Sequence, residues 1–93
     1  MKISVIILTF NESKHIKRAI NSVSALSDDI IIVDSYSIDK TIEISKKLKT
    51  KVFKNKFINQ AQQFNWALNN VKIKNSWILR LDADEYLSKE LII

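Results

Sequence analysis

Two aspartates one residue apart, Asp82 and Asp84, are the side chains in this sequence best suited to chemistry. Carboxylates on one turn can present oxygen atoms to a hard divalent cation such as Mg²⁺ or Mn²⁺. A cation held there can bridge two phosphate groups and neutralise the charge that builds up on a diphosphate leaving group. The simpler alternative is that both aspartates cap a following helix and stay solvated. Because the pair ends the hydrophobic stretch 77–81, we favour the metal site.

Further polar side chains follow two other apolar stretches. Thr9, Asn11 and Glu12 come at and after the end of the first, and Asp34 ends the second. In open parallel sheets, ligands bind beyond the carboxyl ends of the strands, where loops from neighbouring strands meet. A carboxylate at Asp34 can accept an N–H of a nucleobase or the hydroxyls of a ribose, although an acid at a strand end often caps the next helix instead. The sequence therefore predicts one rim shared with the aspartate pair.

Alternating strand and helix patterns place these residues. Apolar runs predict four strands, at 3–9, 30–34, 51–53 and 77–81, and the first of them is continuous and rich in β-branched residues. Segments with apolar residues at a period of 3.6 predict helices between them, with apolar positions at 16–23, then near 40–48 and at 60–70. Strands that alternate with helices are typical of a parallel α/β sheet. We expect residues 1–93 to form one Rossmann-like α/β unit in the order βαβαβαβ.

Three details of packing follow from the same patterns. We expect Asn11 or Ser13 to cap the first helix. Trp66 and Trp77 fall on the apolar sides of their elements and are expected to pack in the core. The helix at 60–70 is expected to bury the face that carries Ala61, Phe64, Leu68 and Val71.

Composition excludes several kinds of site. The 93 residues contain no cysteine, which excludes disulfides, thiolate nucleophiles and cysteine metal sites. They contain no glycine, so neither a P-loop nor a glycine-rich dinucleotide fingerprint is present. The net charge of +5 comes mainly from scattered lysines, concentrated at 46–56. We interpret them as solubilising, with attraction of an anionic substrate or a membrane surface as the functional alternative.

We expect neither a signal peptide nor a membrane span in this sequence. The opening apolar run is too short for a signal peptide, and no segment approaches the roughly 20 apolar residues of a membrane span, so we expect a cytoplasmic protein. A further helix is expected to start near Ser88, and the apolar residues 91–93 would follow it at once. We therefore expect the chain to be a truncated part of a larger enzyme.

Four blocks of this sequence resemble family 2 glycosyltransferases in order and spacing. Three are residues 4–12 (SVIILTFNE), 31–41 (IIVDSYSIDKT) and 77–85 (WILRLDADE), and residues 63–68 (QFNWAL) are similar to a helix of the same family. The blocks at 31–41 and 77–85 are closest to the branch similar to lipopolysaccharide core β-glucosyltransferases. The family usually has glycine where this chain has Tyr36, which bears on the geometry of that loop.

The resemblance implies the nucleotide-binding half of a GT-A fold that takes a nucleotide-diphosphate sugar, a UDP-sugar being favoured. It implies nucleotide-sugar contacts at Thr9, Asn11, Glu12, Asp34, Asp82 and Asp84, the last two also holding Mg²⁺ or Mn²⁺. The expected reaction is an inverting transfer to a glycan or lipid-linked acceptor such as a lipopolysaccharide core, at the inner face of the cell membrane.

No catalytic base is assigned from the sequence. An inverting transfer needs a carboxylate that deprotonates the acceptor, and in such enzymes it lies beyond this segment. Glu85 is an acid in the right neighbourhood, but we expect the 93 residues alone to be inactive.

Two hypotheses from other classes remain. One is a non-catalytic nucleotide- or phosphate-binding module, such as a receiver-like domain, although the end of the first strand lacks the acidic pair that such a domain needs. The other is a small basic nucleic-acid-binding protein, suggested by the charge of +5. Because no stretch interleaves aromatic and basic residues, we expect no nucleic acid partner.

Overall fold

The computed structural model describes residues 3–84, in which four strands alternate with three helices. The elements are β1 (Ile3–Thr9), α1 (Ile16–Val23), β2 (Asp29–Asp34), α2 (Thr41–Lys47), β3 (Lys51–Lys54), α3 (Gln60–Asn70) and β4 (Trp77–Asp82). The strands pair in parallel in the order β3-β2-β1-β4. The predicted α/β fold is confirmed, while the helix expected near Ser88 lies outside the described residues.

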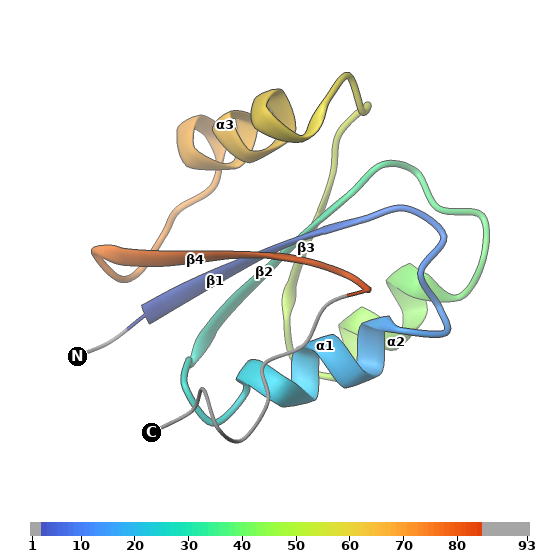
Figure 1. Ribbon diagram of the computed structural model, residues 1–93, viewed down its shortest axis with the longest axis horizontal. Helices are drawn as coiled ribbons and strands as arrows, with labels where there is room; N and C mark the ends of the chain where they lie inside the picture. The colour runs from blue at the N-terminus through green and yellow to red at the C-terminus, as the bar shows by residue number, and fades with distance from the viewer. Residues whose placement is uncertain (1–2, 85–93) are drawn as a thin grey trace.

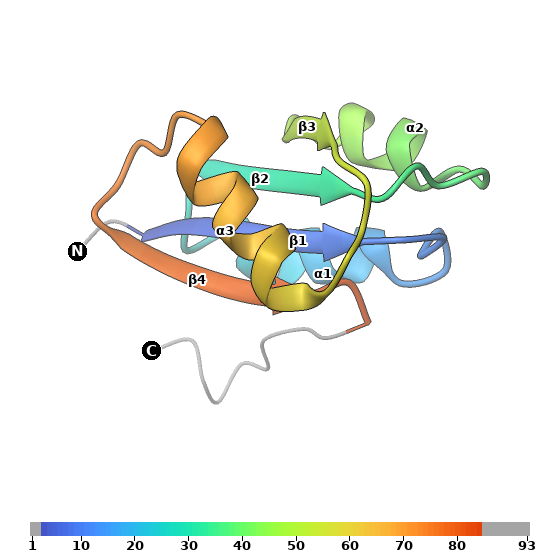
Figure 2. The same cartoon turned by 90° about the horizontal axis from the view of Figure 1, so that it is seen from above.

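The sheet is covered on both faces (Figures 1 and 2). Helices α1 and α2 lie on one face and α3 lies on the other. Successive side chains of β1 point to opposite faces, so Val5 and Ile7 pack with α1 while Ile6 and Leu8 pack toward α3. Two buried layers explain why β1 is a continuous apolar run rather than an alternating one.

Helix α1 begins later than its expected capping residues. The carbonyl oxygen of Glu12 accepts hydrogen bonds from the backbone N–H groups of His15 and Ile16, at 3.0 and 2.9 Å. His15 occupies the N-cap position, and its side chain makes no capping hydrogen bond. The expectation that Asn11 or Ser13 caps this helix is wrong, because a backbone turn separates both residues from its first turn.

Helix α3 buries the expected face only in part: Phe64 and Val71 pack with the buried cluster as predicted. Its buried residues are Gln63 and Ala67, while Leu68 is 39% exposed and Ala61 is also exposed. A polar residue holds the inward position because its amide finds partners in the neighbouring loops. Trp66 packs against the buried cluster as predicted.

Trp77 is the second correction to the expected core. Its side chain is 63% exposed, because it starts β4, which lies at the edge of the described sheet. It pairs with Ile3, the first residue of β1. Among residues 3–84, none of the helices has the length and apolar character needed to cross a membrane.

A buried aspartate joins three segments at the amino-terminal edge of the sheet. Asp29 Oδ2 accepts hydrogen bonds from the hydroxyl of Ser4 at 2.6 Å and from the backbone N–H of Lys74 at 2.8 Å. The ammonium of Lys51 lies 2.6 Å from its Oδ1. Burial acts to raise the pKa of Asp29, but Lys51 and the two hydrogen bonds together hold that pKa below its usual value.

Several lysines of the basic segment have structural positions. Lys51 and Lys54 are exposed on β3, the other edge strand, where charged side chains oppose pairing with further strands. Lys46 and Lys47 lie in the last turn of α2, where a positive charge is favourable beside the helix carbonyl groups. Lys46, Lys47 and Lys54 lie at the surface, as solubilising lysines would, whereas Lys51 also pairs with the buried Asp29.

Candidate functional site

The sheet brings three predicted strand ends side by side. In the register of the central strand β1, Thr9 lies opposite Asp34 of β2 and Leu8 lies opposite Asp82 of β4. The chain continues from β1 to β2 on one side, and β4 pairs on the other. This arrangement is a topological switch point, where open α/β sheets bind their ligands.

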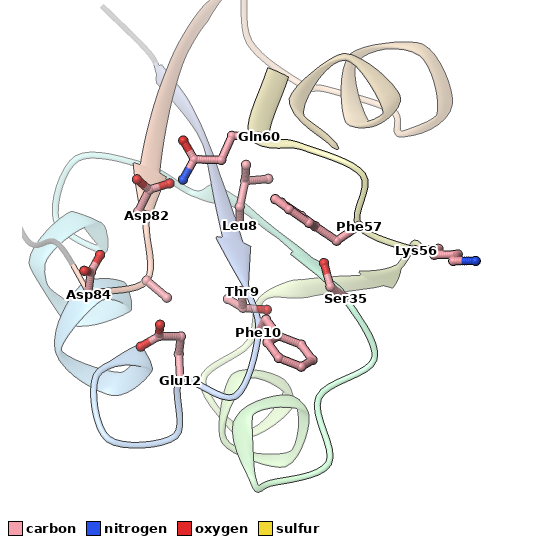
Figure 3. A pocket seen from close by; sticks show the side chains of 11 residues that line it. Leu8, Thr9, Phe10, Glu12, Ser35, Lys56, Phe57, Gln60, Asp82 and Asp84 are labelled. Atoms are coloured by element: carbon pink, nitrogen blue, oxygen red, sulfur yellow. The ribbon is translucent and has the colours of Figure 1, made fainter. Parts of the chain in front are cut away.

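A pocket of about 680 Å³ opens at this edge (Figure 3). It is lined by residues at the ends of β1 and β4, in the loops after all four strands and at the start of α3: Leu8, Thr9, Phe10, Glu12, Ser35, Lys56, Phe57, Gln60, Asp82, Ala83 and Asp84. Four of the predicted site residues are among them: Thr9, Glu12, Asp82 and Asp84. The other two, Asn11 and Asp34, do not line it.

The pocket has an acidic side and an aromatic side. Figure 3 shows the carboxylates of Glu12, Asp82 and Asp84 on the side formed by α1 and β4. Phe10 and Phe57 lie on the other side, and they remain 57% and 49% exposed. Exposed phenylalanine rings that face a pocket are suited to contact a flat, partly apolar ligand group.

The buried residue between the two aspartates explains why both of them line the pocket. Ala83 between them is 3% exposed and belongs to the core cluster on the α1 face. With that side chain turned inward, Asp82 and Asp84 both line the pocket, the first half-buried and the second exposed. The guanidinium of Arg18 donates a hydrogen bond to the backbone carbonyl of Asp84 at 3.4 Å. The turn is therefore anchored on the α1 side of the sheet.

The aspartates fit a cation that a ligand helps to hold. Among residues 3–84, no three acidic or histidine side chains lie close enough together to bind a metal by themselves. Mg²⁺ is usually held by one or two carboxylates, with substrate phosphates and water as its other ligands. Asp82 and Asp84 supply hard oxygen donors of that kind at the mouth of a pocket.

Asp34 has a role inside the chain. Its side chain is 0% exposed, and its carboxylate accepts hydrogen bonds from the hydroxyls of Thr9 and Ser37, each at 2.6 Å. The backbone N–H of Ser37 donates a third, at 2.7 Å. Asp34 therefore organises the turn after β2, and does not cap α2, which begins only at Thr41.

The loops after β1 and β2 are fastened to each other. Asn11 donates its backbone N–H to the hydroxyl of Ser37 at 2.7 Å, and its side-chain oxygen accepts from the N–H of Ile38 at 2.9 Å. The N–H of Glu12 donates to the hydroxyl of Thr41 at 2.8 Å. These bonds hold the backbone that carries Glu12 to the pocket.

Asp39 adds another fastening between the same loops. It accepts hydrogen bonds from the backbone N–H groups of Thr41 at 2.9 Å and of Ser13 at 3.1 Å, and from the Thr41 hydroxyl. Partial desolvation acts to raise the pKa of Asp39, but these donors lower it to about 2. The carboxylate is therefore charged, and holds both loops, at every physiological pH.

Tyr36 occupies a backbone conformation that favours glycine. Its φ angle is 62°, in the left-handed region, and its side chain is 56% exposed. Only glycine enters that region without a steric cost, which for other residues is about 1–2 kcal/mol. The turn after β2 thus takes a glycine-type geometry although the sequence supplies tyrosine.

Sequence reasoning missed the aromatic side of the pocket. Phe10 lies inside a segment that was singled out, but only its polar neighbours were assigned. Lys56 and Phe57 follow β3, and Gln60 starts α3. The rule that strand ends share one edge applies equally to the third strand, and it would have pointed to this loop.

A family model and several relatives identify the chain as similar to glycosyltransferases. The sequence model of glycosyl transferase family 2 matches residues 4–92. An uncharacterized glycosyltransferase of Rickettsia bellii is 48% identical over 90 residues, which cover 97% of this chain and 30% of that protein. The prophage-derived glycosyltransferase SunS of Bacillus subtilis is 37% identical over 92 residues, covering 90% of this chain and 20% of SunS. The chain thus spans less than a third of either relative.

Solved structures with the same fold hold nucleotides and metal ions. Glucosyl-3-phosphoglycerate synthase from Mycobacterium tuberculosis, in complex with Mn²⁺, UDP and glucosyl-3-phosphoglycerate, matches with a TM-score of 0.76 and 20% identity over 91% of this chain and 35% of that one. The mannosyltransferase PcManGT from Pyrobaculum calidifontis, in complex with GDP-Man and Mn²⁺, matches with a TM-score of 0.76 and 19% identity over 91% and 28%. At such identities the likeness establishes a shared fold alone.

Proposed function

The chain belongs to glycosyl transferase family 2, and on that premise we propose that its pocket binds the nucleotide-diphosphate sugar donor of a glycosyl transfer reaction. The observation that carries the proposal is the division of the pocket. Its acidic side holds Asp82 and Asp84, and its aromatic side holds Phe10 and Phe57. The donor has matching parts, a flat base at one end and a diphosphate that links its ribose to the sugar.

The aromatic side suits the base and the ribose. A nucleobase has an apolar π-face, and stacking on an aromatic ring contributes about 1–3 kcal/mol per base in nucleic acid complexes. Thr9 and Ser35 place hydroxyl groups beside the rings, although the hydroxyl of Thr9 is already donated to Asp34. For Asn11 and Asp34 we propose a positioning role, because both hold the loops and neither lines the pocket.

The acidic side cannot accept a diphosphate without a counter-charge. Three carboxylates line it, and like charges at close range repel a phosphorylated ligand. We therefore propose that Asp82 and Asp84 hold Mg²⁺ or Mn²⁺, which when bound would neutralise the diphosphate as it leaves. Glu12 lies on the same side of the pocket, and we propose that it orients hydroxyls or water there. The metal ions and nucleotides in the solved structures of similar fold support this assignment.

The acceptor and the location are further parts of the proposal. The sequence blocks closest to lipopolysaccharide core glucosyltransferases favour an inverting transfer to a glycan or lipid-linked acceptor at the inner face of the cell membrane. The family match favours a glycosyltransferase over the two other classes considered from the sequence.

A titration of UDP in the presence of Mn²⁺ tests the donor site. Phe57→Ala should weaken UDP binding about tenfold, since it removes a ring that lines the pocket. Ile58→Ala is the matched control, because Ile58 is the adjacent exposed apolar residue and does not line the pocket. Equal losses in both variants would contradict the proposal. Failure to bind UDP or GDP, with salt-sensitive binding of duplex DNA, would instead support a nucleic-acid-binding protein.

A further inference from the structure

Gln63 is a buried polar residue that the donor site does not use directly. Its side chain is 2% exposed on α3, and it does not line the pocket. Glutamine is mostly found at the protein surface, and its amide is costly to bury unless its polar atoms are paired. A buried glutamine is therefore expected to have hydrogen-bond partners for its amide group.

Its partners lie in two different loops. The amide nitrogen of Gln63 donates to the hydroxyl of Ser35 and to the backbone carbonyl of Asn55, each at 3.1 Å. Its amide oxygen accepts from the side-chain nitrogen of Asn55 at 2.9 Å. Both donor hydrogens and the acceptor are in use, so the amide is satisfied by the loop after β2 and the loop after β3 together.

Both partners border the pocket. Ser35 lines it, and Asn55 directly precedes Lys56 and Phe57, which also line it. The backbone N–H of Asn55 donates to the carbonyl of Asp34 at 2.9 Å, which ties the two loops together where Gln63 meets them. An apolar side chain at position 63 would leave the groups on Ser35 and Asn55 without their partner in a partly buried place.

We propose that Gln63 is a positioning residue, which sets the aromatic side of the pocket by joining the loop of Ser35 to the loop of Asn55 and Phe57. It acts from α3 without touching the ligand. The inference rests on the proposed function for what the pocket binds, but the link between the loops can be measured in the free chain.

Amide hydrogen exchange tests the link without any ligand. Gln63→Met keeps the length of the side chain and removes its three hydrogen bonds. We expect faster exchange at the amides of Ser35 and Asn55, which donate to Thr9 and Asp34, and unchanged exchange at Val71, the C-cap residue of α3, which donates to Ala67. Gln62→Met is the control, because Gln62 is the adjacent exposed glutamine on the same helix. Unchanged exchange at both loop amides would overturn the inference, as would an equal increase throughout the chain.

Titration with UDP and Mn²⁺ then separates this inference from the proposed function. Gln63→Met should raise the dissociation constant about fivefold, the effect of losing roughly one net hydrogen bond, and Gln62→Met should leave it unchanged. If the unaltered chain does not bind UDP, the proposed function fails, and the exchange result alone decides the role of Gln63. If the unaltered chain binds and Gln63→Met binds equally well, the inference is overturned.

A second variant adds a pH profile that a simple packing role would not produce. In Gln63→Glu, the new buried carboxyl should have a raised pKa and should take up a proton as the pH falls from about 8 to about 5.5. The protonated form can donate one hydrogen bond to Ser35 or Asn55, whereas the charged form cannot donate. UDP affinity relative to the unaltered chain should therefore recover toward low pH. A flat ratio, like the one expected for Gln62→Glu, would contradict a role through hydrogen bonds.

Discussion

The hydroxyl of Thr9 donates a 2.6 Å hydrogen bond to the fully buried carboxylate of Asp34, across the two central strands of the sheet. Thr9 ends β1 and lines the pocket, while Asp34 ends β2 and also accepts two hydrogen bonds from Ser37. One carboxylate thus fixes a pocket residue and the turn that follows the neighbouring strand. Asp34 therefore contributes both to the stability of the fold and to the position of a pocket residue.

Asp34→Ala should therefore lower stability as well as ligand affinity. The change leaves the hydroxyls of Thr9 and Ser37 and one backbone N–H without their acceptor, which should lower the free energy of unfolding by about 2 kcal/mol. Urea denaturation of the variant and of the unaltered chain measures this difference in the free energy of unfolding. Asp28→Ala is the control, because Asp28 is an exposed aspartate in a surface ion pair with Lys74 and should matter little. Equal stability of the Asp34 variant and the unaltered chain would show that these hydrogen bonds contribute no net stability.

Tyr36→Gly should stabilise the chain. Glycine takes the left-handed conformation without the steric cost that tyrosine bears, although its greater freedom in the unfolded chain offsets part of the gain. We expect a net increase of about 0.5–1 kcal/mol in the free energy of unfolding, measured by urea denaturation. Tyr36→Ala separates the effect of the backbone conformation from the effect of the exposed ring, because it removes the ring but keeps the Cβ atom. If alanine stabilises as much as glycine, the benefit comes from removing the exposed ring.

Asp29 should make stability sensitive to acid. Its pKa is lowered in the folded chain, so its contribution is present above the unfolded pKa of about 3.9 and is lost as the pH falls through the lower folded value. Asp29→Asn should be less stable than the unaltered chain at neutral pH, and it should lose less stability between about pH 6 and about pH 3. Urea denaturation across that range gives both slopes.

The control for Asp29 is an exposed acid elsewhere in the chain. Glu43 pairs with Lys47 one turn away at 3.8 Å, and both side chains are largely exposed. Glu43→Gln should keep the same loss of stability toward acid as the unaltered chain. Parallel curves for all three proteins would mean that Asp29 gains no net stabilisation from Lys51, Ser4 and Lys74.

Much of the fold could be predicted because the strong signals are local. The β-branched runs gave β1 its full length, and the strands and α2 differ from their predicted bounds by at most one residue at either end. The placement of Thr9 and Asp82 at one edge of the sheet was also predicted, because parallel strands end at one edge. These inferences needed only the hydrophobic period and the order of the elements.

The rest depended on tertiary partners that a single sequence does not reveal. Gln63 is buried on α3 because Ser35 and Asn55 satisfy its amide, whereas Leu68, which was expected in the core, is 39% exposed. Asp34 is buried for the same kind of reason. Trp77 is exposed because it starts a strand at the sheet edge, which depends on strand order rather than on local pattern.

The central claim is that Asp82 and Asp84 hold a divalent cation together with a nucleotide diphosphate. Calorimetric titration of UDP into the full chain, with and without Mn²⁺, tests it most directly. We expect Mn²⁺ to strengthen UDP binding by more than about fivefold, and Asp84→Asn to remove most of that gain, since it removes a charged ligand group. Asp28→Asn, at the opposite edge of the sheet, should keep the gain. Equal UDP affinity with and without Mn²⁺, or a gain that survives in Asp84→Asn, would contradict the account.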